Sequence, residues 1–176
     1  MKQILISLCL FGVAMSVMSA EGDKRELLAE HETVAEFLGL QFKQCLGRTS
    51  LCPDQCGQSG NFATFRIIKY VNYKKHGQYG DPQGTTFVTQ VDDNLGKMKL
   101  PEAQVKLLRA LQKGDFVRLD WHHDYVTTGG SSSPERPLIR VVKLSVAEAR
   151  QLAGDTALEA SPAKPEPSAP QRPSPR

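Results

Sequence analysis

The clearest pattern in the chain is an alternation of apolar and polar residues between Gly114 and Val126. One face of this stretch carries five largely apolar positions, Val117, Leu119, Trp121, His123 and Tyr125. The other face carries four polar ones, Arg118, Asp120, His122 and Asp124. Because successive side chains of a β-strand point to opposite faces, this period of two predicts a strand with a buried side and a polar side.

Further stretches are rich in aromatic and β-branched residues and are bounded by turn residues, as strands are. Strands are therefore expected over residues 62–73, 85–91 and 138–144, with a short additional one around residues 97–99. Taken together with the 114–126 stretch, these patterns predict a mainly β domain.

Helices are expected in three places. Over residues 23–46, apolar residues recur at intervals of three and four, which is typical of a helix; they are Leu27, Val34, Phe37, Leu38 and Phe42. A second, short helix is expected after Pro101 and ends before Gly114. Ser145 and Glu148 have the spacing of a capping box and predict a last helix over residues 146–152.

The two ends of the chain differ from the middle. Lys2 is followed by an apolar run that ends in small residues at Ser19 and Ala20. This is the pattern of a secretory signal peptide over residues 1–20, and it predicts a protein exported to the periplasm or secreted. Residues 155–176 are rich in proline and poor in apolar residues, which predicts a disordered tail.

Length and charge limit the remaining possibilities. A chain of 176 residues with 40% hydrophobic residues is long enough for one domain with extensions. We expect an N-terminal helix and a cysteine-containing loop in residues 21–61, followed by the β domain and a C-terminal helix in residues 62–154. The formal net charge of +3 is too small for the basic footprint of a dedicated nucleic-acid-binding protein.

The order of three strands, a short helix and two more strands resembles an OB-fold, a small five-stranded β-barrel. The resemblance covers Phe62 to Leu144 and rests on this order, on the aromatic-rich first strand and on Lys113-Gly114-Asp115 before the fourth. It implies that ligands meet the loops 75–84 and 127–136.

These two loops would bring His76, Tyr79 and Arg136 to one mouth of the barrel, with His122 and Asp124 at the end of the fourth strand. The simpler interpretation is that the glycines and prolines of both loops only make turns.

Three cysteines, Cys45, Cys52 and Cys56, lie in an irregular segment. In an oxidising compartment a disulfide is expected, and its pairing is left open by the sequence. The alternative is a zinc site in which the three thiolates take a fourth ligand from His76, His122 or His123. A reactive thiol in redox exchange is the third possibility.

Asp120, His122 and Asp124 form a polar row that could bind a divalent ion or support acid–base chemistry, although charged rows on strands are usually ordinary solvated faces. The chain has no phosphate-binding loop, dinucleotide fingerprint or nucleophile elbow. The sequence therefore favours a non-enzymatic binding module for a protein, glycan or small-molecule ligand. The alternative is a metal-binding or thiol-redox protein that uses the three cysteines with a histidine.

Overall fold

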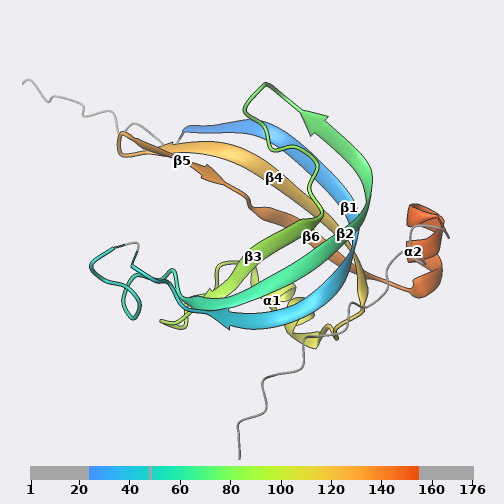
Figure 1. Cartoon of the computed structure of the whole chain (residues 1–176), viewed down its shortest axis with the longest axis horizontal. Helices are drawn as coiled ribbons and strands as arrows, with labels where there is room; N and C mark the ends of the chain where they lie inside the picture. The colour runs from blue at the N-terminus through green and yellow to red at the C-terminus, as the bar shows by residue number, and fades with distance from the viewer. Residues whose placement is uncertain (1–23, 48, 155–176) are drawn as a thin grey trace, which may run out of the picture.

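The computed structural model describes residues 24–47 and 49–154, which form an antiparallel sheet of six strands and two helices (Figure 1). The elements are β1 (Lys24–Lys43), β2 (Gly60–Lys75), β3 (Thr86–Asp93), α1 (Glu102–Ala110), β4 (Phe116–Thr128), β5 (Ser131–Glu135), β6 (Leu138–Leu144) and α2 (Val146–Ala153). The predicted mainly β class with flanking helices is confirmed. The expected signal peptide and the proline-rich tail lie outside the described residues.

The predicted N-terminal helix is wrong, because residues 24–43 form the longest strand of the sheet. β1 is central and pairs along most of its length with both β2 and β4. Its inner face follows a period of two through five buried residues, Ala29, His31, Thr33, Ala35 and Phe37. Only Phe37 among them contributed to the helical pattern. Pairing on both sides overrides the local spacing of the apolar residues.

The strands follow the order β3-β2-β1-β4-β5, and β6 also pairs with β4. The sheet curves strongly, but the described strands do not close into the expected barrel, since β3 and β6 are not paired with each other. The segment after β3 folds back along the end of that strand. The amide of Lys99 donates to the carbonyl of Val91 at 2.9 Å, and the amide of Asp93 donates to the carbonyl of Lys97 at 2.9 Å. Part of the edge of β3 is therefore already occupied.

The main core fills the concave side of the sheet, where α1 packs its buried Val105 and Leu108. α2 covers the opposite side, where Ala149 and Ala153 pack with Val34 and Leu144. The expected capping box starts α2, with the Ser145 hydroxyl accepting from the Glu148 amide. Among the described residues, neither helix is long and apolar enough to cross a membrane.

Two details of the β4 region differ from the predictions. The alternation of burial changes phase near the end of β4, so that Asp124 is 3% exposed and Tyr125, expected in the core, is 42% exposed. A register shift in β1 opposite this point, between Leu27 and Ala29, accounts for the change. The expected loop after β4 contains β5, which a two-residue turn at Gly129 and Gly130 joins to β4. Both glycines have positive φ, 56° and 80°, as tight hairpin turns require.

The predicted strand around residues 97–99 is reduced to an isolated bridge between Asp92 and Met98.

Candidate functional site

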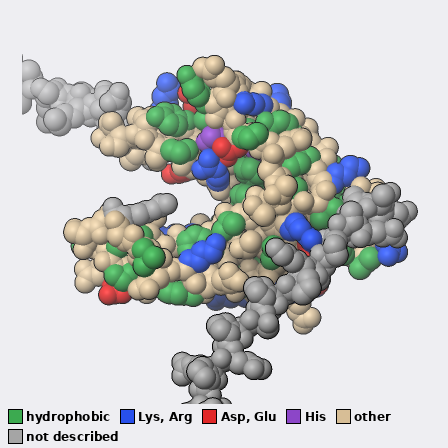
Figure 2. Space-filling view, viewed as in Figure 1, with side chains coloured by type: hydrophobic (Ala, Val, Ile, Leu, Met, Phe, Trp, Pro, Cys, Tyr) green, Lys and Arg blue, Asp and Glu red, His purple; other side chains and the backbone are tan. Residues whose placement is uncertain are grey.

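A cleft of about 860 Å³ opens where a closed barrel would have paired β3 with β6. In the space-filling view it is the deep notch between the arm that carries β4 and β5 and the arm that carries residues 44–47 and 49–59, here called the Cys loop (Figure 2). The residues that line it come from the Cys loop, β3, the segment before α1, and β5 with the turn into β6. They are Gln58, Thr89, Gln90, Lys99, Leu100, Pro101, Ser133, Pro134, Glu135, Arg136, Pro137 and Leu138.

The charged groups of the cleft are paired with neighbouring side chains. Lys99 Nζ lies 2.8 Å from Asp93 Oδ2. Arg136 donates two hydrogen bonds to the Asp81 carboxylate, at 2.6 and 3.0 Å. Glu135 accepts from Arg25 at 2.8 Å. The cleft therefore presents amides, hydroxyls, prolines and leucines beside charges that are already compensated.

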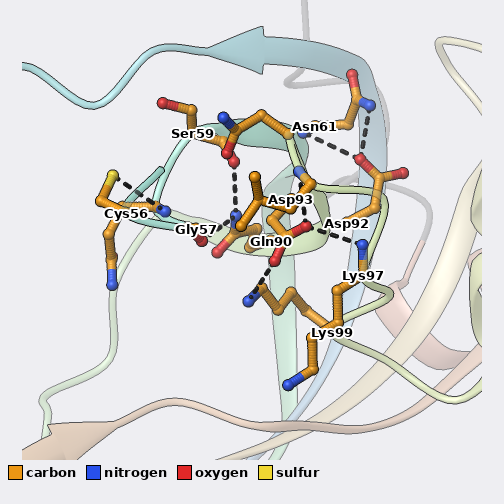
Figure 3. A network of polar contacts seen from close by, with 12 residues as sticks. Cys56, Gly57, Ser59, Asn61, Gln90, Asp92, Asp93, Lys97 and Lys99 are labelled. Carbon is orange, nitrogen blue, oxygen red and sulfur yellow. Dashed lines mark hydrogen bonds and ion pairs between the residues drawn. The ribbon is translucent and has the colours of Figure 1, made fainter. Parts of the chain in front are cut away.

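Two buried aspartates at the end of β3 hold the floor of the cleft together (Figure 3). Asp92 accepts from the Asn61 side chain at 2.7 Å and from Arg109 at 2.8 Å. Asp93 accepts from Lys99 and from the backbone amide of Lys97, and these bonds hold the pKa of its carboxyl below the usual value. Both carboxylates are thus satisfied and serve as structural anchors.

The Cys loop is fastened to this floor by the side chains of β3 and the turn after it. Gln90 Nε2 donates to the carbonyls of Gly57 and Ser59, at 3.3 and 3.2 Å. Asn94 Nδ2 donates to the carbonyl of Asp54 at 2.5 Å. The Ser59 hydroxyl accepts from the Cys45 amide at 3.0 Å and donates to the carbonyl of Pro53 at 2.7 Å. An irregular segment with little regular structure of its own is thereby held in a defined place.

The three cysteine sulfurs lie together within this loop. The Sγ atoms of Cys45, Cys52 and Cys56 all lie within 4.8 Å of one another, and those of Cys45 and Cys52 are 3.1 Å apart. A disulfide needs a separation of about 2.05 Å, so the structure shows close thiols rather than a disulfide bond.

No histidine joins these sulfurs, contrary to the predicted fourth ligand of a zinc site. In the described part of the chain, the cysteines form the only cluster of three or more such ligand groups. His76 instead pairs with Glu30, and His123 Nδ1 accepts from the Asp81 amide at 3.0 Å. The long β1 explains this, because it carries the Cys loop away from the strand ends where these histidines lie.

The two loops predicted to meet do meet, through the Arg136–Asp81 contact. Burial alone would raise the pKa of Asp81, but the hydrogen bonds and charge of Arg136 outweigh it, so the pKa is lowered. Tyr79 lies in the same region and is 75% exposed. It borders a second hollow of about 500 Å³, whose lining is Glu26, Leu28, Tyr79, His123, Tyr125 and Pro134.

The polar side chains of β4 pair with residues of different neighbouring strands. Asp120 accepts from Arg140 and Asp124 from Arg25, both at 2.6 Å. His122 Nδ1 lies 4.0 Å from Asp124 Oδ1, which is too long for a direct hydrogen bond. Both carboxylates thus have arginine partners, and the row does not assemble a metal site among the described residues.

Sequence reasoning missed Gln58, Gln90 and Lys99, which line the cleft. The reason is the strand count. With residues 24–43 as the first strand, the loop between the first two strands is the Cys loop rather than residues 75–84.

Comparison with protein-family models, with characterised proteins and with solved structures finds no match for this chain.

Proposed function

We propose that this protein is an exported, non-enzymatic binding module that holds an extended, uncharged polar ligand, a peptide segment, in the cleft between the Cys loop and the β5–β6 region. The observation that carries the proposal is the cleft itself, about 860 Å³ in volume and lined from both of these segments and from β3. A pocket of this size is in the range that proteins use for ligands.

The corrected strand count supports the OB-like interpretation of the cleft. With β1 included, the chain runs through three strands, α1 and then β4 and β6, the element order of the OB-fold. Ligands of such partly open barrels meet strands two and three and the loops joining strands one to two and four to five. In this chain those loops are the Cys loop, which contributes Gln58 to the lining of the cleft, and residues 129–137, which contribute Ser133 to Pro137.

The chemistry of the lining favours a peptide. Gln58, Thr89 and Ser133 offer donors and acceptors that match peptide groups, and Gln90 offers its side-chain oxygen as an acceptor. Leucine and proline residues provide apolar contact. The described lining contains no aromatic side chain, and its Lys99 and Arg136 have carboxylate partners. Single-stranded nucleic acid, which relies on base stacking and on cationic grooves, is therefore not favoured.

The experiment compares the wild-type protein with two tryptophan variants on peptide and glycan arrays. Ser133→Trp places a large side chain in the cleft, whereas Gln151→Trp changes an exposed residue of α2 and serves as the matched control. We expect peptides bound by wild type and by Gln151→Trp, with affinity reduced roughly tenfold or more in Ser133→Trp, equivalent to about 1.4 kcal/mol.

Soluble versions of the bound peptides are then measured by calorimetry. Because the cleft charges are compensated, affinity for these peptides should change little between low and moderate salt. Peptides that bind Ser133→Trp as well as wild type would contradict the cleft as the site. Binding of glycans alone, or of oligonucleotides with a steep loss in salt, would contradict the proposed ligand class.

A further inference from the structure

The three cysteines are close enough to share one metal ion. Three sulfurs bound to an ion at about 2.3 Å lie roughly 3.8–4.0 Å from one another. In the Cys loop the three Sγ atoms are within 4.8 Å of each other, and the closest pair, Cys45 and Cys52, is 3.1 Å apart. Side-chain movements of about 1 Å would therefore bring all three sulfurs to a common ion.

Backbone amides of the same loop point at the sulfurs. The amide of Thr49 donates to Cys52 Sγ and the amide of Gln58 donates to Cys56 Sγ, both at 3.4 Å. The Thr49 hydroxyl is a further partner of Cys52 Sγ at 3.5 Å. Such donors stabilise a thiolate and orient it, as the outer hydrogen bonds of metal sites do.

The Cys52 sulfur has several polar partners within the loop, namely Cys45 Sγ and the amide and hydroxyl of Thr49. The Thr49 hydroxyl, followed by Cys45 and then Cys56, lowers the pKa of the Cys52 thiol to about 6.

The ligand set consists of sulfur alone. In the described residues the cluster contains neither an imidazole nor a carboxylate. Soft thiolate ligands select Cu(I) and Zn(II) over ions that prefer oxygen, such as Mg²⁺ or Ca²⁺. All three cysteines are partly exposed, and Cys45 lines a hollow of about 300 Å³ that shares Gln58 and Gln90 with the cleft. An ion could therefore reach the sulfurs from solvent.

We propose that Cys45, Cys52 and Cys56 form a three-thiolate binding site for a thiophilic metal ion, Cu(I) or Zn(II). Cu(I) is served by the three sulfurs alone, whereas Zn(II) takes a water molecule as its fourth ligand. The metal ligands are distinct from the residues proposed to contact the peptide, because none of the three cysteines lines the cleft. Binding exchanges thiol protons for the ion and involves no change of oxidation state.

The test uses the full mature chain, reduced and kept free of oxygen, and titrates Cu(I) and Zn(II) separately against a chromophoric chelator. We expect one ion per chain. Each of the variants Cys45→Ser, Cys52→Ser and Cys56→Ser should weaken metal binding by more than roughly 100-fold. Loss of a residue that only hydrogen-bonds to a metal ligand weakens binding by roughly 10–100-fold, and loss of a ligand itself should cost more. The controls His76→Ala and His122→Ala should bind as wild type does, because their imidazoles lie outside the cluster.

A second measurement does not depend on the folding of any variant. One equivalent of metal should protect all three cysteines of the wild-type protein from alkylation, as read by mass spectrometry. The proposal is overturned if fewer than three cysteines are protected, if one serine variant keeps wild-type affinity, or if a histidine control loses it. A disulfide that persists in reductant and leaves only one thiol would also overturn it.

Discussion

His31 lies flat against Trp121, with ring centroids 3.5 Å apart and planes inclined by 6°. His31 is 2% exposed, and within the described structure neither of its ring nitrogens has a hydrogen-bond partner. Burial in this aromatic environment lowers the pKa of His31 to about 4. The imidazole is therefore neutral in the folded protein at pH values where it is already charged in the unfolded chain.

This difference predicts acid destabilisation. The pKa of His31 in the folded state lies below the ordinary value of 6.5. The stability contributed by the neutral His31 is therefore complete above pH 6.5 and is lost as the pH falls toward 4. Over this range the free energy of unfolding should decrease by about 2–3 kcal/mol on account of His31. Urea unfolding of wild type and His31→Phe at a series of pH values measures the effect. Equal pH dependence of the two proteins would contradict it.

The lowered pKa of Cys52 predicts its reactivity. Alkylation of Cys52 in the metal-free, reduced protein should rise with a midpoint near pH 6, because the thiolate is the reacting form. Thr49→Val removes the hydroxyl partner and should move the midpoint upward, whereas Thr49→Ser should preserve it. Rates for each cysteine are read by mass spectrometry. A midpoint near pH 9 in the wild-type protein would exclude the thiolate.

The Arg136–Asp81 contact joins the turn before β6 to the loop before β3. Arg136→Met should lower the free energy of unfolding at pH 7 by about 1 kcal/mol. The two hydrogen bonds strengthen the ion pair, whereas the partial exposure of both side chains weakens it. The pKa of Asp81 is lowered in the folded state, so this stability is present above its ordinary pKa of 3.8 and is lost as the pH falls below it.

The matched control is Arg140→Met, which removes a partner of Asp120 instead. In an NMR titration the pKa of Asp81 should rise in Arg136→Met and stay unchanged in Arg140→Met. An unchanged Asp81 pKa in both variants would show that Arg136 does not control it.

Gly60 connects the Cys loop to β2 at a point of close backbone approach. A Cβ at this position would lie 2.0 Å from the carbonyl oxygen of Asp92, and φ is 155°. Gly60→Ala should therefore cost roughly 3 kcal/mol of stability. Gly77→Ala is the control, because a Cβ there meets nothing within 4 Å. Its effect should remain within about 1 kcal/mol of wild type in the same thermal or urea unfolding measurement.

Local patterns predicted the elements in which one face is buried and the opposite face is exposed. The alternation around Val117 and Leu119 marked β4, and the spacing of Ser145 and Glu148 marked the start of α2. In both cases the residues that form the sequence pattern also make the stabilising contacts: Val117 and Leu119 are buried, and Ser145 and Glu148 form the capping box. The same reasoning failed for β1, because its buried face includes Ala29, His31 and Thr33, which hydrophobicity alone does not mark.

For the candidate sites, the sequence by itself determined the residue chemistry: three cysteines in one irregular segment and two turn-rich loops. Only the tertiary structure decided their surroundings. Pairing of β1 on both sides made it a strand, and its length separates the Cys loop from the histidines. The return of residues 97–99 along β3 leaves the cleft open. These outcomes depend on contacts between residues far apart in the chain, which no local spacing records.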